Sequence, residues 1–357
     1  MSAAALALVV ACSGEDGAAP SSSTSSSGSS GDGSSTSSSS TSSSSGDASP
    51  SAWETVEPIG AEADWVAERV SYRSGGLKIF GRVCRPKAAG KYKTLVLNHG
   101  GFEGHGPFDK NQCANTVKNG YVTLESSYRG EDGSEGKIEL CLGEVDDVIA
   151  MVDVSKQLPY VDAAKTVMAG LSHGGCITTR AVQRGAKVAA AADVFGPKDL
   201  AVEYVFLKAS KQAGQQGLDP LIQLAETVTG GTPETKPEEY RKRSPAAFAS
   251  DLDKFAGPYT MVHGVQDVLV SVKQTCSFAA VVKDTKSFHL DGTLAVVTTD
   301  PPTCEGTNVT WLPGPKPTTW PGTRYALVYD GAAHEVSTPS GAAMYLDALG
   351  FLVAKNP

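Results

Sequence analysis

The chain has 357 residues, of which 40% are hydrophobic and 20% are charged, and its formal net charge is −8 at pH 7. An acidic balance of this size excludes the basic footprint that binding to nucleic acid requires. The six histidines are scattered without an H-x-x-x-H pair, and the cysteines form no C-x-x-C pair, so neither a metal site nor a cofactor site is expected.

The first 51 residues differ in composition from the rest of the chain. Residues 1–12 are apolar and end in Val9-Val-Ala-Cys12, which is similar to the lipobox of bacterial lipoproteins, so Cys12 is a candidate lipidation site. Residues 13–51 are almost entirely Ser, Gly, Thr and Asp, which predicts a disordered tether. Together they predict an exported protein, either secreted or held at the bacterial cell envelope (outer membrane or periplasm) by a lipid. The apolar run lacks a preceding Lys or Arg, which leaves open a disordered leader without a lipid.

Residues 52–357 are long enough for one large core, and strand and helix patterns alternate along them. In chain order the sequence predicts a hairpin over 69–85, a strand over 94–99, a helix over 108–119, a strand over 121–126, a helix over 144–157, a strand over 166–169 followed by a helix, strands over 188–195 and 258–263, a helix over 272–282, a strand over 324–329 and a helix over 341–353. This alternation predicts an α/β protein with a mostly parallel sheet and helices on both faces.

Two segments interrupt the alternation. Residues 197–255 are polar, with candidate helices over 200–209 and 218–228. A long excursion between two core strands usually covers a functional site, so a helical cap insertion is expected there. Residues 284–322 are rich in Thr and Pro and are expected to form a second insertion outside the sheet.

The segment Gly170-Leu-Ser172-His-Gly174 joins a predicted strand to the following helix. Small residues on both sides of a serine at such a turn are typical of the G-x-S-x-G nucleophile elbow. The strained turn lifts the serine hydroxyl above the sheet, and the helix N-terminus favours developing negative charge beside it. The pentapeptide also arises by chance, so a plain tight turn is the alternative interpretation. The strand-turn-helix context favours the elbow, with Ser172 as nucleophile.

A serine nucleophile needs a base within hydrogen-bond reach, and the base needs an orienting acid. On a doubly wound sheet these partners follow later strands, in the chain order Ser, Asp, His. Asp267 follows the predicted strand over 258–263, and His334 follows the last predicted strand. The sequence therefore predicts a Ser172–His334–Asp267 triad. The alternatives are a turn-capping role for Asp267 and a helix-capping role for His334.

His289 is the competing base downstream of Asp267, but it is expected inside the second insertion and not at the end of a core strand. The tetrahedral intermediate also needs two donors for its oxyanion. One is predicted to be the backbone N–H of His173, and the other a backbone N–H of Gly101 or Phe102, in the loop after the strand over 94–99.

Two further histidines, His99 and His263, lie at the ends of predicted strands. Their side chains are expected to hydrogen-bond to backbone within the loops and to take no part in the chemistry.

Six cysteines remain once Cys12 is set aside, and an even number in a chain with an export signal predicts disulfides. The sequence does not determine the pairing. The pairs that would each close a local loop are Cys276 with Cys304 and Cys113 with Cys141. Free buried thiols are the alternative for Cys84 and Cys176.

Several motifs taken together resemble the catalytic domain of the prolyl oligopeptidase family. They are His99-Gly-Gly, Ser127-Tyr-Arg-Gly130, Glu144-Val-Asp-Asp147, Pro159-Tyr-Val-Asp162, Gly170-Leu-Ser-His-Gly-Gly175, Tyr240-x-x-Arg-Ser-Pro245 and His263-Gly-x-x-Asp267. That domain has the α/β-hydrolase fold and is related to dienelactone hydrolases and acetyl esterases. The resemblance covers about residues 69–357. It implies that Ser172 is the nucleophile, Asp267 the orienting acid and His334 the base.

The family's peptidases carry a large β-propeller ahead of this domain, whereas here the tether and a predicted hairpin precede it. We therefore expect a serine hydrolase that forms an acyl-enzyme on Ser172, with a small-molecule carboxylic ester favoured as substrate. A serine peptidase that acts on aminoacyl or oligopeptide substrates is the alternative. A non-catalytic surface-binding lipoprotein is the alternative of another class, and the presence of every residue that the chemistry needs argues against it.

Overall fold

The computed structural model describes residues 52–356. The lipobox-like segment 1–12 with Cys12 and the tether 13–51 lie outside the described residues, so both stay predictions. Within residues 52–356, no helix has the length and apolar composition needed to cross a bilayer.

One 11-stranded sheet runs through the described residues, in the order β1-β2-β3-β5-β4-β6-β7-β8-β11-β9-β10. Its strands are β1 (Thr55–Ala61), β2 (Trp65–Ser74), β3 (Leu77–Pro86), β4 (Tyr92–Asn98), β5 (Tyr121–Ser126), β6 (Val161–Leu171), β7 (Ala190–Val194), β8 (Tyr259–Gly264), β9 (Thr285–Leu290), β10 (Val296–Val297) and β11 (Arg324–Tyr329). The strands from β5 through to β9 in that order pair in parallel. Strands β1 to β3 at one edge and β10 at the other pair antiparallel. The mostly parallel sheet predicted from the sequence is confirmed.

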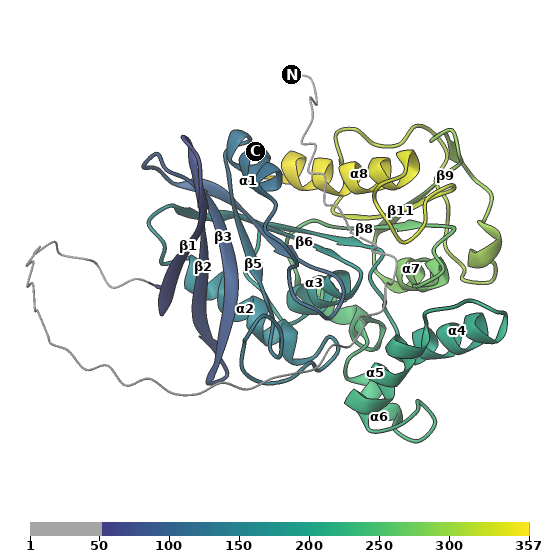
Figure 1. The fold of residues 1–357 in the computed structure, drawn as a ribbon. Coiled ribbons are helices and arrows are strands. Elements are labelled where there is room, and N and C mark those ends of the chain that lie inside the picture. The colour runs from purple at the N-terminus through teal and green to yellow at the C-terminus, as the bar shows by residue number, and fades with distance from the viewer. Residues whose placement is uncertain (1–51, 357) are drawn as a thin grey trace, which may run out of the picture.

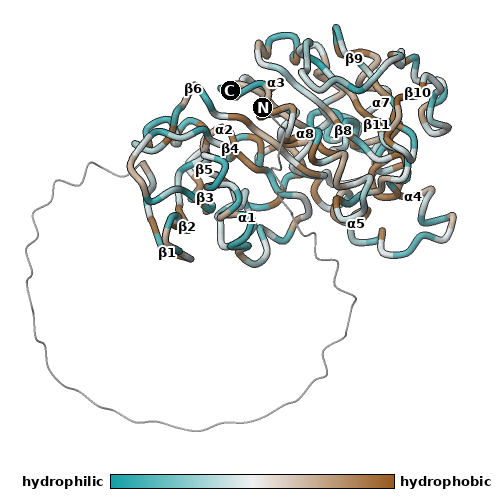
Figure 2. Tube along the Cα trace, turned by 90° about the horizontal axis from the view of Figure 1, so that it is seen from above, coloured by the Kyte–Doolittle hydropathy of each residue, from teal (hydrophilic) through white to brown (hydrophobic). Residues whose placement is uncertain are grey.

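Helices cover both faces of this sheet (Figure 1). On one face lie α2 (Gly143–Ser155), α3 (His173–Gln183) and α7 (Val272–Val281), whose apolar residues share one buried cluster. On the other face lies α8 (Pro339–Lys355), which packs in a second cluster, with α1 (Lys110–Lys118) beside it in Figure 1. Figure 2 shows hydrophobic residues gathered along the inner strands and hydrophilic stretches at the periphery. Burial on both faces explains why the central strands read as continuous apolar runs.

Between β7 and β8 the chain leaves the sheet. It forms α4 (Leu200–Gln212), α5 (Asp219–Thr229), α6 (Pro237–Arg241) and the 3-10 helix η1 (Pro245–Lys254). The predicted helices over 200–209 and 218–228 are confirmed as α4 and α5. Helices α4 to α6 project from one end of the molecule in Figure 1 and have a small core of their own. The buried residues of that core are Tyr204, Leu207, Leu218, Ile222 and Tyr240.

The expectation that residues 284–322 lie outside the sheet is wrong for their first part. Strand β9 pairs in parallel with β11, with Thr285 opposite Arg324 and Leu290 opposite Tyr329. In β9 the buried apolar residues Phe288 and Leu290 alternate with polar ones, and those polar side chains are buried too. A search for continuous apolar runs misses such a strand, because its pattern resembles a half-exposed segment. Strand β10 then pairs antiparallel with β9, so the excursion from the sheet begins after β10.

Three disulfides occur within residues 52–356: Cys84–Cys113, Cys141–Cys176 and Cys276–Cys304. The predicted pairing of Cys276 with Cys304 is confirmed. The predicted pairing of Cys113 with Cys141 is wrong, and so is the alternative of free thiols at the two remaining positions.

The sheet order explains these pairings better than loop length does. Cys84 lies on β3, and α1 packs over that strand, so Cys113 shares a buried cluster with Cys84 and Trp65. Cys141 lies in the loop before α2, and its partner Cys176 lies in the first turns of α3. Contacts between elements distant in sequence set both pairs, and the sequence alone does not show them.

Candidate active site

Ser172 lies at the junction of β6 and α3 with φ 54° and ψ −121°. A positive φ is uncommon for a residue with a Cβ and persists only where its surroundings hold it. Here the Ser172 N–H donates to Val194 O at 2.9 Å, and Ser172 O accepts from Gly175 N–H at 2.8 Å. The strained strand-turn-helix junction expected around Ser172 is therefore present.

The two glycines of the elbow are required by close approach of the backbone. A Cβ on Gly170 would lie 2.0 Å from Gly174 O, and a Cβ on Gly174 would lie 2.1 Å from Asn98 O. Either substitution would push β6, α3 or the end of β4 apart. These contacts explain why the turn needs small residues on both sides of Ser172.

The structure brings the three predicted triad residues together at the carboxyl end of the sheet. His334 Nε2 lies 2.9 Å from Ser172 Oγ, and His334 Nδ1 lies 2.7 Å from Asp267 Oδ2. The carboxylate accepts a hydrogen bond from Nδ1–H, which leaves the Nε2 lone pair facing the serine hydroxyl. The competing base His289 lies elsewhere, with its Nδ1 2.7 Å from Thr299 O. The arrangement can move a proton from Ser172 to His334 while Asp267 stabilises the charge that forms.

The Asp267 carboxylate is buried and accepts four hydrogen bonds. Besides His334, its donors are His263 Nε2 at 3.1 Å, Leu269 N at 2.9 Å and Val270 N at 2.8 Å. Burial raises the pKa of this carboxyl, but the hydrogen bonds of the two histidines outweigh that effect and hold the pKa well below its usual range. Asp267 is therefore a fixed negative charge beside His334.

His263 is the site residue whose role sequence reasoning missed. Its Nδ1 lies 2.7 Å from Thr275 Oγ1, and its Nε2 lies 2.9 Å from Val270 O as well as 3.1 Å from Asp267 Oδ2. The backbone hydrogen bond is present as expected, but the imidazole also faces the triad carboxylate. Because Nε2 faces only acceptors, it carries the proton. The spacing of His263 and Asp267, four residues apart across the end of one strand, could have revealed the contact.

The loop after β4 passes directly beside the nucleophile. A Cβ on Gly100 would lie 3.1 Å from Ser172 Cβ. The predicted oxyanion donors in this loop, Gly101 N–H and Phe102 N–H, follow immediately, and the third predicted donor, His173 N–H, begins α3. As expected, the His99 side chain hydrogen-bonds to backbone, with Nδ1 3.0 Å from Gly100 O.

A second cluster of histidines and carboxylates holds the far end of this loop. Glu131 Oε2 accepts from Gly104 N–H at 2.5 Å, and Asp132 Oδ2 lies 3.1 Å from His105 Nδ1. Burial raises the pKa of Glu131 to about 8 and lowers the pKa of His99 to about 3. Nothing in the sequence except the neighbouring Tyr-Arg-Gly motif indicated this cluster. Within residues 52–356, no group of three or more His, Cys, Asp or Glu side chains is placed to hold a metal ion.

A sequence model of the prolyl oligopeptidase family matches residues 108–291, more than half of the chain. The chain belongs to the prolyl oligopeptidase family. It is accordingly a serine hydrolase with the α/β-hydrolase fold.

One curated relative and two solved structures are similar to this chain. The chain is 25% identical over 207 residues to the uncharacterized peptidase YtmA of Bacillus subtilis (strain 168), covering 58% of this chain and 75% of that protein. An acylaminoacyl peptidase of Pyrococcus horikoshii matches with a TM-score of 0.57 and 18% identity, over 82% of this chain and 41% of that one. Acetyl xylan esterase 1 of Thermoanaerobacterium sp. JW/SL YS485 matches with a TM-score of 0.56 and 13% identity, over 84% and 87% of the two chains. The chain thus spans about two fifths of the acylaminoacyl peptidase. At these identities the two structures show a shared fold.

Proposed function

We propose that this protein is a serine peptidase of the prolyl oligopeptidase type that hydrolyses short peptides or aminoacyl compounds through an acyl-enzyme on Ser172. The observation that carries the proposal is the hydrogen-bonded chain from Asp267 through His334 to the Ser172 hydroxyl. Membership of the family and the peptidase name of the Bacillus subtilis relative support a peptide substrate over the ester favoured from the sequence.

The geometry supports the following steps. Ser172 Oγ attacks the substrate carbonyl carbon while its proton passes to His334 Nε2, and Asp267 stabilises the imidazolium. The backbone N–H of His173 and one N–H of Gly101 or Phe102 stabilise the oxyanion. His334 then gives its proton to the departing amine, the C–N bond breaks, and the acyl-enzyme forms. In the second half of the reaction His334 takes a proton from a water molecule that attacks the acyl carbon, and it gives the proton to Ser172 Oγ as the C–Oγ bond breaks.

A carboxylic ester is the second candidate substrate. The same nucleophile, base and oxyanion donors cleave an ester, and an alcohol leaves more readily than an amine does. The preference between peptides and esters therefore depends on the relative rates at which the same catalytic residues cleave the two substrates.

We also propose that the protein is exported, with lipid attachment at Cys12 as the means of anchoring it to a membrane. The three disulfides support export, because such bonds persist in oxidising compartments. Intact-mass measurement of the protein purified from its native membrane fraction tests the anchor. A Cys12→Ala variant should lack the lipid mass and appear in the soluble fraction.

The decisive experiment compares a short-chain p-nitrophenyl ester with the aminoacyl p-nitroanilide of the same acyl group. We expect the wild type to hydrolyse both substrates and Ser172→Ala to hydrolyse neither. Ester turnover without anilide turnover would replace the peptidase proposal with the esterase. Equal rates for the wild type and the variant would contradict the role of Ser172.

A further inference from the structure

The His173 imidazole lies between two backbone segments that flank the nucleophile. The residue is 5% exposed, with Nε2 3.1 Å from Cys141 N and Nδ1 3.3 Å from Gly101 O. An amide N–H can only donate and a carbonyl can only accept, so Nε2 accepts from Cys141 and Nδ1–H donates to Gly101. Each ring nitrogen thus has one assigned partner.

These two roles require a neutral ring. Burial lowers the pKa of His173, against the smaller opposing effect of the nearby Glu144 carboxylate. The ring also packs against Phe102, with centroids 4.7 Å apart, and meets Tyr128 edge-on at 6.0 Å. The imidazole is therefore held in one tautomer and one orientation.

The acceptor Gly101 O belongs to a peptide group that can supply an oxyanion donor. A trans peptide is planar, with its C=O and N–H pointing in opposite directions, so holding Gly101 O also directs the Phe102 N–H. Gly101 has φ +73°. Glycine rotates freely between positive and negative φ, so this peptide group would reorient easily without an external hydrogen bond.

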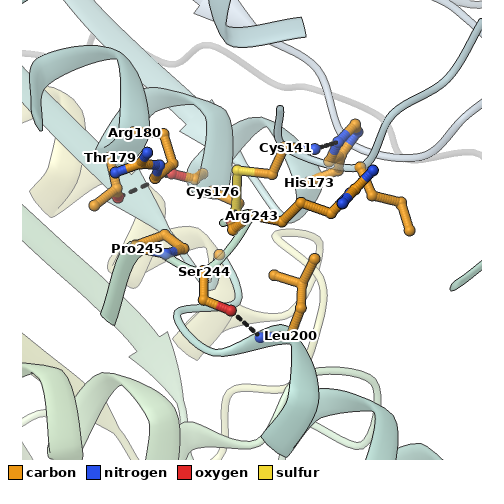
Figure 3. The surroundings of a disulfide bond; sticks show 12 residues. Cys141, His173, Cys176, Thr179, Arg180, Leu200, Arg243, Ser244 and Pro245 are labelled. Atoms are coloured by element: carbon orange, nitrogen blue, oxygen red, sulfur yellow. Dashed lines mark hydrogen bonds between the residues drawn. A yellow bond between two sulfur atoms is a disulfide. The ribbon is translucent and has the colours of Figure 1, made fainter. Parts of the chain in front are cut away.

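The Cys141 side of the ring is fixed to the helix that carries the nucleophile. Figure 3 shows the Cys141–Cys176 disulfide beside the His173 ring, with the hydrogen bond from Cys141 drawn as a dashed line. Cys176 lies one turn into α3, where its N–H donates to Ser172 O at 3.2 Å. The disulfide therefore ties the loop before α2 to the elbow, and His173 links that loop to the oxyanion loop.

The Cys141 loop is itself ordered by a carboxylate. Glu144, in the first turn of α2, accepts from the N–H groups of Glu139, Leu140 and Leu142, at 2.6, 3.1 and 3.1 Å. Only the N–H of Cys141 in this run is directed to His173. A rigid donor thus fixes Nε2, and Nδ1–H is held toward Gly101.

We propose that the His173 side chain is a positioning residue that orients the Gly101–Phe102 peptide group for oxyanion stabilisation, with the Cys141–Cys176 disulfide holding the imidazole in place. The inference rests on the proposed function, because it refines the oxyanion hole of the same site. His173 then acts twice: its backbone N–H is one donor, and its imidazole orients the other.

Three substitutions separate the two hydrogen bonds of the ring. In His173→Asn the side-chain amide lies near the position of Nδ1 and can still donate to Gly101 O. In His173→Gln the amide lies near the position of Nε2 and can accept from Cys141 N–H but does not reach Gly101. His173→Phe fills the space and makes neither hydrogen bond. All three keep the backbone N–H that donates to the oxyanion.

The measurements are kcat and KM on the ester and the anilide, the inhibition constant of phenylboronic acid, and the thermal unfolding midpoint. Phenylboronic acid forms a tetrahedral adduct with a nucleophilic serine and so reports on the oxyanion hole. We expect His173→Asn to keep kcat within about 3-fold of the wild type. We expect His173→Gln and His173→Phe to lower kcat by about 10-fold or more, short of the roughly 10²–10³-fold that loss of a whole donor costs. KM should change little, and the inhibition constant should rise by the same factor as kcat falls.

Two results would overturn the proposal. One is a folded Gln or Phe variant with the kcat and boronate affinity of the wild type. The other is an equal loss in all three variants, which would show that the ring acts by packing alone. Failure of the proposed function itself gives a different result, because the wild type would then be inactive or Ser172→Ala would match it.

Discussion

Two buried carboxyl groups contact different parts of the active site: Asp267 contacts the base His334, and Glu131 contacts the loop that carries the predicted oxyanion donors. The Asp267 side chain is 0% exposed and the Glu131 side chain 1%. Asp267 accepts hydrogen bonds from two imidazoles and two backbone N–H groups. Glu131 accepts from Gly104 N–H, its Oε1 has no hydrogen-bond partner within residues 52–356, and His99 Nε2 is 3.9 Å from Oε2.

The pKa values of these two groups shift in opposite directions although the groups are equally buried. The pKa of Asp267 lies well below its usual range, whereas burial raises the pKa of Glu131 to about 8. The number of donors facing a buried carboxyl therefore decides its charge. A charged Asp267 suits the chemistry, because an anion stabilises the imidazolium of His334. A protonated Glu131 also suits it, because an unpaired anion next to the oxyanion loop would oppose the developing oxyanion.

Removing the negative charge of Asp267 should have the largest effect on activity. Asp267→Asn keeps the size of the side chain but loses the anion that holds the Nδ1–H tautomer of His334. We expect kcat to fall by about 10⁴-fold with little change in KM. Asp253→Asn, an exposed aspartate near the start of β8, is the matched control and should keep full activity. A loss of less than 10-fold in Asp267→Asn would contradict the assigned role.

Removing the His263 hydrogen bond to Asp267 should have a smaller effect, which is a pH-dependent loss of the free energy of unfolding. In the wild type the lowered pKa of Asp267 contributes stability that is present above the unfolded pKa of about 3.9 and is lost as the pH falls toward the folded value. His263→Phe should lower the unfolding free energy by about 1–3 kcal/mol at pH 7. Urea unfolding at pH 7 and at pH 3.5 should show a smaller difference at the lower pH. A difference independent of pH would mean that only the Thr275 and Val270 contacts were lost.

Removing the Glu131 carboxyl should have the smallest effect of the three substitutions. It should raise the stability of the fold, whereas His263→Phe should lower it. Because its pKa is raised, the Glu131 carboxyl stabilises the fold most below the unfolded pKa, and this stability is lost as the pH rises toward about 8. Glu131→Gln cannot ionise, and its amide oxygen can still accept from Gly104 N–H. We expect its thermal midpoint to exceed that of the wild type by an amount that grows from pH 6 to about pH 8 and then levels off, with kcat within about 2-fold. A midpoint gap that narrows over this range would contradict the raised pKa.

The same two parts of the site show what the sequence can and cannot predict. Ser172, Asp267 and His334 are found because each follows a recognisable strand in a fixed order. The parallel sheet follows from apolar runs in the same way. Strand β9 is not predicted from the sequence because Ser287 and His289 are buried polar residues within it. The Cys84–Cys113 and Cys141–Cys176 disulfides are not predicted because each joins elements distant in sequence.

The sequence also does not predict the hydrogen bonds of buried side chains. The contact of His263 with Asp267 and the bridging role of His173 depend on which way a ring turns once the loops are packed. Glu131 is an ordinary acidic loop residue in the sequence, and only its burial beside Gly104 distinguishes it. Local motifs thus predict the reacting groups, while the groups that set their charge and orientation come from tertiary structure.

The most direct test of the account is the reaction of the protein with a fluorophosphonate, followed by intact-mass measurement and peptide mapping. We expect one adduct per chain, on Ser172, because His334 accepts the proton of this hydroxyl. Ser172→Ala should remain unmodified. An adduct on another residue, or none on an intact and folded protein, would contradict the claim that Ser172, His334 and Asp267 form a working nucleophilic site.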